Sequence, residues 1–129
     1  IRDLVRSRGL RDVYKRQILG SSRDPSFGSL IMFGLGGIYV EVLKDISFRI
    51  APLTLEDAES MIREVHSYTI LKGVRGEEPS DLEAVKEALL RLSQLVTDFP
   101  EILEMDINPL MVLPSGKGAV VIDSRLTIK

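Results

Sequence analysis

The first half of the chain alternates turn signals with short hydrophobic runs. Residues 21–28 are rich in Ser, Asp, Pro and Gly, and an apolar run at residues 30–33 leads into a glycine cluster at residues 34–37. Residues 38–50 are rich in Ile, Val, Tyr and Phe, and Pro52 follows them. Because such residues are typical of strands and proline interrupts them, we predict a turn at residues 21–28 and a strand at residues 38–50.

Two later stretches repeat their apolar residues three or four positions apart, which predicts two amphipathic helices. The first follows Thr54, which makes a capping-box pattern with Asp57. The second follows Ser80, which makes another with Glu83, and it ends at residues 98–100. The predicted buried stripes are Leu55, Ala58, Met61, Ile62 and Val65 in the first helix, and Leu82, Val85, Leu89, Leu92 and Val96 in the second.

The carboxy-terminal residues predict a β-hairpin. Residues 102–113 and 118–128 are apolar and strand-like, and residues 114–117 form a four-residue loop. If Leu113 pairs with Gly118 across this loop, the numbers of paired residues sum to 231 along the hairpin. Strands, two helices and a hairpin predict an α+β fold, with the helices packed on one face of a mostly antiparallel sheet.

One group of polar residues in the hairpin indicates metal chemistry. Glu104, Asp106 and Asn108 alternate along the first strand and therefore share one face. The predicted register places Asn108 opposite Asp123 and Asp106 opposite Arg125. Opposed residues have Cβ atoms about 4.5–5.5 Å apart, so an amide and a carboxylate oxygen can share one Mg²⁺. The alternative is an exposed polar face with an ordinary salt bridge between Asp106 and Arg125.

Glycine-rich sequences offer weaker candidates for phosphate binding. The sequence with Gly34, Gly36 and Gly37 resembles a phosphate-binding loop, and Glu41 is a polar residue shortly after it. Neither the Lys-Ser/Thr of a Walker A motif nor the helix of a dinucleotide-binding motif follows, so a tight β-turn is the competing interpretation. Arg75, flanked by glycines, can either clamp a phosphate or lie solvated in an exposed loop. No catalytic residue is assigned from the sequence.

Composition restricts the class of protein. At 129 residues, 44% of them hydrophobic and 28% charged, the chain has the length of one globular domain. It contains no Cys and one His, which excludes a disulfide framework, a thiolate zinc site and a His-rich metal site. It has no Trp, few other aromatic residues and no apolar run long enough to span a bilayer. We therefore expect neither nucleic acid nor a membrane as a partner.

The first 17 residues differ in charge from the rest. They carry six basic and two acidic residues, a net +4, against 11 basic and 17 acidic residues in the remainder, a net −6. Residues 12–17, Asp-Val-Tyr-Lys-Arg-Gln, resemble the translation of a transposon adapter used in sequencing libraries. We interpret residues 1–17 as a non-native or disordered extension and residues 18–129 as the domain. A basic arm for an anionic partner is the alternative.

Several ordered motifs between Ile18 and Lys129 carry a family resemblance. They are Arg23-Asp24-Pro25-x-Phe27-Gly28, the run from Leu30 to Glu41, Phe48-Arg49-x-Ala51-Pro52-Leu53, Gly73-Val74-Arg75-Gly76, Leu92-Ser93-x-Leu95-Val96-x-Asp98-Phe99-Pro100 and Asp106-Ile107-Asn108-Pro109-Leu110. Together they resemble the ATP-grasp β subunit of NDP-forming acyl-CoA synthetases, and ADP-forming acetate–CoA ligases in particular. The related succinyl-CoA synthetase β subunit shares a shorter version of the last motif.

The resemblance implies a fold and a reaction. The chain would be the carboxy-terminal part of an ATP-grasp domain, whose enzyme converts acyl-CoA, ADP and phosphate into a carboxylic acid, CoA and ATP through an acyl phosphate and a phosphohistidine. The cofactors would be Mg²⁺ and ATP or ADP. The phosphohistidine would lie on a separate CoA-binding α domain or subunit, and the enzyme would be cytoplasmic. The amino-terminal half of the ATP-grasp domain lies outside this sequence, so the chain alone is expected to be inactive.

The resemblance also implies roles for individual residues. Asn108 and Asp123 would bind the metal, with Asp106 beside them. The glycines at 34, 36 and 37, together with Glu41 and Arg75, would face the nucleotide. Two other interpretations stay open: a non-catalytic module that docks on a CoA-binding domain, and the synthetase-like region of a protein acyltransferase. An upstream phosphate-binding Lys, or a downstream acetyltransferase domain, would distinguish them.

Overall fold

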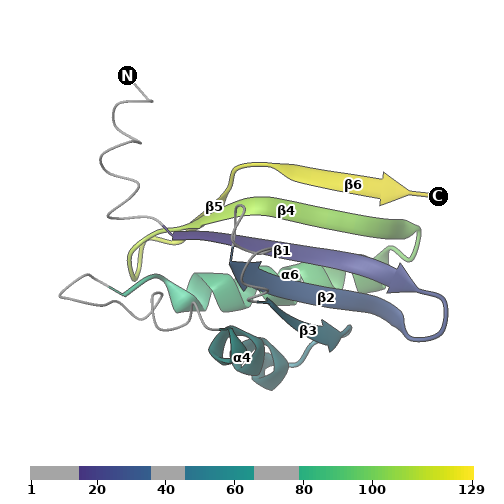
Figure 1. Ribbon diagram of the computed structural model, residues 1–129, viewed down its shortest axis with the longest axis horizontal. Helices are drawn as coiled ribbons and strands as arrows, with labels where there is room; N and C mark the ends of the chain where they lie inside the picture. Colours follow the sequence, from purple (N-terminus) through teal and green to yellow (C-terminus); the bar gives the residue numbers. More distant parts are fainter. Residues whose placement is uncertain (1–14, 36–45, 66–78) are drawn as a thin grey trace.

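The computed structural model describes residues 15–35, 46–65 and 79–129 of the chain. The described elements form six strands and two helices in the order β1, β2, β3, α4, α6, β4, β5, β6 (Figure 1). Their bounds are Lys15–Asp24 (β1), Gly28–Leu35 (β2), Ile46–Ile50 (β3), Leu55–Glu64 (α4), Leu82–Asp98 (α6), Ile102–Val112 (β4), Ala119–Val121 (β5) and Ser124–Ile128 (β6). No helix of the described ranges is long and apolar enough to cross a membrane.

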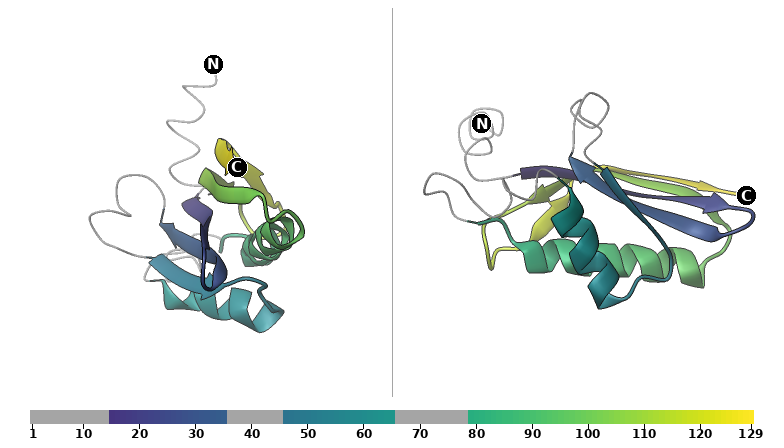
Figure 2. Two further views of the ribbon diagram at one scale, coloured as in Figure 1. Left: turned by 90° about the vertical axis from the view of Figure 1, so that its right-hand side faces the viewer. Right: turned by 60° about the horizontal axis from the view of Figure 1, so that its bottom comes forward.

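The sheet is antiparallel, and both helices lie on one of its faces (Figure 2). The strand order is β3-β2-β1-β4-β5, and β6 pairs with β4 beyond the end of β5. The predicted α+β class, with helices on one face of an antiparallel sheet, is confirmed. The opposite face carries no helix of the described part (Figure 2).

The stretch predicted as a turn, residues 21–28, is a hairpin whose strand β1 continues to Asp24. Asp24 Oδ1 accepts hydrogen bonds from the backbone N–H groups of Ser26 (2.7 Å) and Phe27 (3.0 Å), and Gly28 has a positive φ of 91°. The turn is therefore shorter than predicted. Ladders with β2 on one side and β4 on the other hold these polar residues extended against their weak local preference for strand.

The first strand begins before the predicted boundary at Ile18. Strand β1 starts at Lys15, and residues 15–17 pair with the end of β4. Residues 15–17 are therefore extended and paired with β4, while their origin and the domain boundary at Ile18 stay predictions. Residues 1–14 lie outside the described part, so their non-native origin stays a prediction. Gln17 is 1% exposed, and its Oε1 has no hydrogen-bond partner in the described part of the chain.

Helix α4 begins as the sequence predicts. The backbone N–H of Asp57 donates to Thr54 Oγ1 (3.1 Å), and the N–H of Thr54 donates to Asp57 Oδ2 (3.0 Å), which completes the capping box. Leu55 was predicted to be buried but is 56% exposed, because the first residue of the helix lies beyond the edge of the core. The other members of the predicted stripe are buried: Ala58, Met61, Ile62 and Val65.

Helix α6 begins one residue later than its predicted cap. Asp81 is the N-cap and accepts a hydrogen bond from the N–H of Ala84 (3.0 Å), so the predicted capping box from Ser80 is wrong. Ser80 instead forms a β-bridge with Pro114. Leu82 is only half-buried, whereas the remaining apolar face is buried as predicted: Val85, Leu89, Leu92 and Val96. The helix ends at Asp98, as expected.

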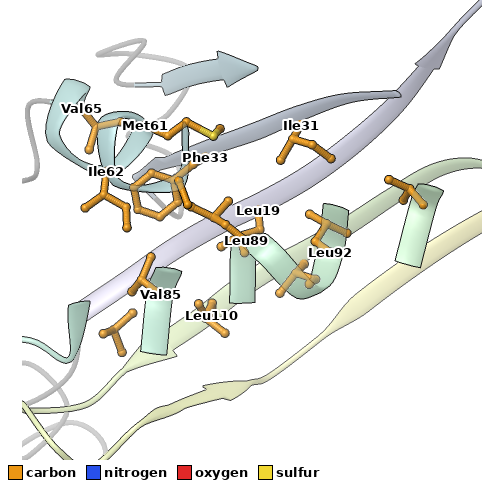
Figure 3. Close-up of a cluster of buried hydrophobic side chains, with 14 of the residues drawn as sticks. Leu19, Ile31, Phe33, Met61, Ile62, Val65, Val85, Leu89, Leu92 and Leu110 are labelled. Atoms are coloured by element: carbon orange, nitrogen blue, oxygen red, sulfur yellow. The ribbon is translucent and has the colours of Figure 1, made fainter. Parts of the chain in front are cut away.

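The core lies between the helices and the sheet (Figure 3). Leu19, Ile31 and Phe33 from the sheet meet Met61 from α4 and Leu89 from α6, and all five are fully buried. Two hydrogen bonds connect the helices to the rest of the fold. Ser47 Oγ donates to the carbonyl of Met61 (3.0 Å) in a buried bond, and Ser93 Oγ accepts from the N–H of Leu53 (2.8 Å) in a partly buried one. The core therefore occupies the helix side of the sheet, and the polar residues of β4 lie on the opposite side.

Candidate functional site

The hairpin at the carboxy-terminal end has the predicted register. Asp106 pairs with Arg125, and Leu113 N–H donates to the carbonyl of Gly118 (3.0 Å), so paired numbers sum to 231. Asn108 lies opposite Asp123, and its N–H donates to the Asp123 carbonyl (3.1 Å). The predicted second strand is divided into β5 and β6, since Pro109 has no N–H to donate at that point of the ladder.

The opposed polar residues line a pocket of ≈ 170 Å³ on the sheet face away from the helices. Its lining residues are Asp106, Asn108, Asp123, Ser124 and Arg125. Met105 and Ile107, which alternate with the first two, pack toward the core as predicted. The period of two along β4 therefore separates a polar, solvent-accessible face from an apolar, buried one.

The oxygen atoms of this pocket fit a hard cation. Asp123 Oδ1 accepts a hydrogen bond from the N–H of Ser124 (2.9 Å), which orients the carboxylate beside Asn108. Within residues 15–35, 46–65 and 79–129 there is no cluster of three His, Cys, Asp or Glu side chains. A metal ion here would thus take few ligands from the protein and the rest from water or phosphate, which is how Mg²⁺ commonly binds with nucleotides.

The alternative interpretation predicted an ordinary salt bridge between Asp106 and Arg125. They are directly opposed in the ladder, but the described residues show no ion pair between them. The cross-strand salt bridge that would make this an ordinary surface is therefore not formed. Ser124, which the sequence analysis passed over, also lines the pocket; its position next to Asp123 was the available signal.

The glycine candidates lie only partly within the described chain. Gly34 is inside β2, paired with Ile18 and Ile46, so a tight turn at this residue is wrong. Since Phe33 faces the core, Gly34 faces the same side of the sheet as Asn108, two strands or about 10 Å away. Four further candidates lie outside the described residues: Gly36, Gly37, Glu41 and Arg75. So does the predicted strand before Ile46.

Two arginines of the quoted motifs have structural partners. Arg23 Nη2 donates to the carbonyl of Val96 (3.0 Å) in the last turn of α6, where a positive charge is favourable. Arg49 Nη2 lies 2.8 Å from Glu64 Oε2, which ties β3 to α4. These side chains hold the fold together and take no part in the pocket.

A larger hollow of ≈ 560 Å³ lies where α6 begins, beside the turn between β4 and β5. Four of its charged residues already have partners in the fold: Asp81, Glu83, Lys86 and Glu87. Asp81 Oδ2 accepts hydrogen bonds from the N–H groups of Gly116 (3.1 Å) and Gly118 (2.7 Å). The hydrogen bonds that Lys86 donates to Glu83 and Glu59 raise the pKa of its ammonium group above the ordinary value of 10.5. The pocket on the opposite face is therefore the better candidate site.

Comparison with known proteins finds a matching family model and several similar proteins. A family model described as an ATP-grasp domain matches residues 12–128. The chain is 55% identical over 114 residues to acetate–CoA ligase [ADP-forming] I of Archaeoglobus fulgidus, which covers 88% of this chain and 16% of that protein. It is also 55% identical over 113 residues to the acetate–CoA ligase [ADP-forming] II subunit beta of Pyrococcus furiosus, covering 87% of this chain and 48% of that one.

Among solved structures, a similar one is a dinucleotide-forming acetyl-coenzyme A synthetase 1 of Ca. Korarchaeum cryptofilum. That protein is in complex with coenzyme A and Mg-AMPPCP, with its phosphohistidine segment pointing towards the nucleotide-binding site. The TM-score is 0.84 at 49% identity, over 89% of this chain and 53% of that chain. The chain thus spans between about a sixth and about half the length of these relatives.

Proposed function

The chain belongs to the ATP-grasp domain family, and from this we propose that it forms the carboxy-terminal, nucleotide-binding part of an ADP-forming acyl-CoA synthetase. The identities of 55% to two ADP-forming acetate–CoA ligases support this proposal. The complete enzyme would convert acyl-CoA, ADP and phosphate into a carboxylic acid, CoA and ATP. The rest of the ATP-grasp domain and a CoA-binding domain with the phosphohistidine would complete it.

The observation that carries the proposal is the opposition of Asn108 and Asp123 across the hairpin. Their side chains supply one amide and one carboxylate oxygen to the same pocket. Asp106 adds a second carboxylate two positions before Asn108 on the same face of β4. We propose that Asn108 and Asp123 hold Mg²⁺ and that Asp106 lies beside them.

In this proposal the chain positions charges and performs no covalent chemistry. Bound Mg²⁺ would neutralise phosphate charge as it develops during transfer. Asn108 lies on β4 and Asp123 lies between β5 and β6, and the backbone hydrogen bond from Asn108 N–H to the Asp123 carbonyl (3.1 Å) would hold their side chains side by side before the nucleotide arrives. Gly34 lies on the same sheet face, where a residue without a side chain leaves room for the nucleotide. The phosphoryl group passes from phosphohistidine to ADP, which leaves a free histidine and ATP.

Replacing Asp123 with asparagine in the complete enzyme tests the proposal. The change keeps the size of the side chain and removes one negative charge from the pocket. We expect Mg²⁺-dependent ATP formation from acetyl-CoA, ADP and phosphate to fall about 100-fold or more, the effect of losing one preorganised electrostatic contact. The matched control is Asp98→Asn, at the exposed end of α6, which should keep wild-type activity.

Circular dichroism is the control for folding, because Asp123 is exposed and makes no contact with the core. A folded Asp123→Asn enzyme with wild-type rate and unchanged Mg²⁺ dependence would contradict the proposal. It would leave Asp123 as a solvated residue between β5 and β6.

A further inference from the structure

We propose that Arg125 binds a phosphate group of the nucleotide in the pocket that holds Asn108 and Asp123. The inference rests on the proposed nucleotide site and adds to it a residue that the sequence assigned only to a salt bridge. It starts from the position of Arg125 on β6, directly opposite Asp106 and on the lining of the pocket.

Arg125 lies on the same face of the sheet as the polar residues of β4. Directly opposed residues of an antiparallel pair project from the same face with Cβ atoms about 4.5–5.5 Å apart. Arg125 and Asp106 are such a pair, so the guanidinium group starts from the face that carries the metal-binding oxygens. β6 is an edge strand, exposed along its length, and no described element covers the side chain of Arg125. The guanidinium group can therefore reach across the pocket.

The charges in the pocket also favour a phosphate-binding role for Arg125. Asp106 and Asp123 bring two negative charges to the pocket, and a nucleotide polyphosphate brings several more. One Mg²⁺ leaves an excess of negative charge that a further cation must compensate. Arg125 is the only cationic residue that lines this pocket in the described chain. Its planar fork of N–H donors matches two phosphate oxygens at once.

Arg125 also differs from Arg23 and Arg49 in its partners. Arg23 donates to the carbonyl groups of Val96 and Ile102, and Arg49 pairs with Glu64. Arg125 has no such structural partner among residues 15–35, 46–65 and 79–129, although Asp106 lies opposite it. An arginine next to a carboxylate and not paired with it is available for an anion.

The test uses three variants of the complete enzyme. Arg125→Met keeps the length of the side chain and removes its charge, and Arg125→Lys keeps the charge and removes the fork. The control is Arg91→Met, because Arg91 is an exposed arginine of α6 that pairs with Glu87 (2.7 Å) and lies on the helix side of the sheet. Isothermal titration calorimetry measures the binding of ADP and of the β,γ-methylene analogue of ATP, each with Mg²⁺.

We expect Arg125→Met to weaken binding of at least one nucleotide about 10- to 100-fold, as for the loss of a charge-assisted hydrogen-bond pair. Arg125→Lys should recover part of the loss, and Arg91→Met should bind like the wild type. Loss with the ATP analogue alone places Arg125 on the terminal phosphate, and loss with both places it on the phosphates that they share.

Binding of both nucleotides within twofold of wild type by folded Arg125→Met overturns the inference. The Asp123→Asn enzyme separates this result from failure of the proposed function. If Asp123→Asn is impaired and Arg125→Met is not, the metal site stands and Arg125 is excluded. If both variants match the wild type, the proposed function itself fails.

Discussion

Replacing Gln17 with methionine should stabilise the protein. Gln17 lies in the central part of the sheet, on the face of β1 that meets the helices, and pairs with the buried Leu110 of β4. Its Oε1 is buried and accepts no hydrogen bond within the described residues. Methionine has a similar length and no strong hydrogen-bonding group, so it removes an unsatisfied acceptor without opening a cavity.

The size of the effect follows from this burial. A buried acceptor without a partner costs about 1–3 kcal/mol relative to its hydrated state in the unfolded chain. Since the side chain of Gln17 is almost completely buried, we expect Gln17→Met to raise the free energy of unfolding by about 1–2 kcal/mol. For a domain of this size that corresponds to a rise in Tm of about 3–12 °C.

Urea unfolding followed by circular dichroism measures the change, with Gln94→Met as the matched control. Gln94 lies on the exposed side of α6, where its amide donates to Asp98 (2.8 Å), so the control should change stability by less than about 0.5 kcal/mol. Equal or lower stability of Gln17→Met would refute the reasoning, since it would mean that Oε1 is satisfied after all. A higher free energy of unfolding for Gln17→Met would agree with position 17 belonging to the adapter-like stretch. A residue of foreign origin has not been selected to fit the core.

Two further substitutions test how α6 is held. Asp81→Ala removes the N-cap of α6 and the acceptor for two loop N–H groups, one of them that of Gly118 at 2.7 Å. We expect it to lower the free energy of unfolding by about 2–4 kcal/mol in urea titrations. An unchanged unfolding midpoint would contradict a stabilising role for these bonds. Lys86 has a raised pKa because it donates to Glu83 and Glu59. The stability that these bonds contribute is therefore complete below pH 10.5 and is lost as pH rises through the raised pKa. Lys86→Met should reduce stability at neutral pH and weaken the alkaline loss; identical pH profiles would exclude the linkage.

Features that depend on near neighbours could be predicted from the sequence. The capping box of Thr54 and Asp57 involves residues three apart, and the buried stripes follow from the helical period. The hairpin register follows from the length of a single loop, and it brings Asn108 opposite Asp123. The opposed pair could therefore be found from the sequence, because the short loop fixes which residues of the two arms of the hairpin face each other, even though Asp123 lies in the break between β5 and β6.

The tertiary structure decided whatever depends on contacts between distant segments. Residues 21–24 have turn composition, yet they are extended because β2 pairs with all four of them and β4 pairs with Ser21 and Ser22. The position of β1 in the sheet also buries Gln17, which no local pattern marks as a core residue. The hairpin register predicted a salt bridge between Arg125 and Asp106. Only the arrangement of the side chains in the structure reveals that this bond is absent among the described residues. Local hydrogen bonds and periodicity determine elements and short loops, whereas strand order and the partners of each side chain depend on packing across the whole sheet.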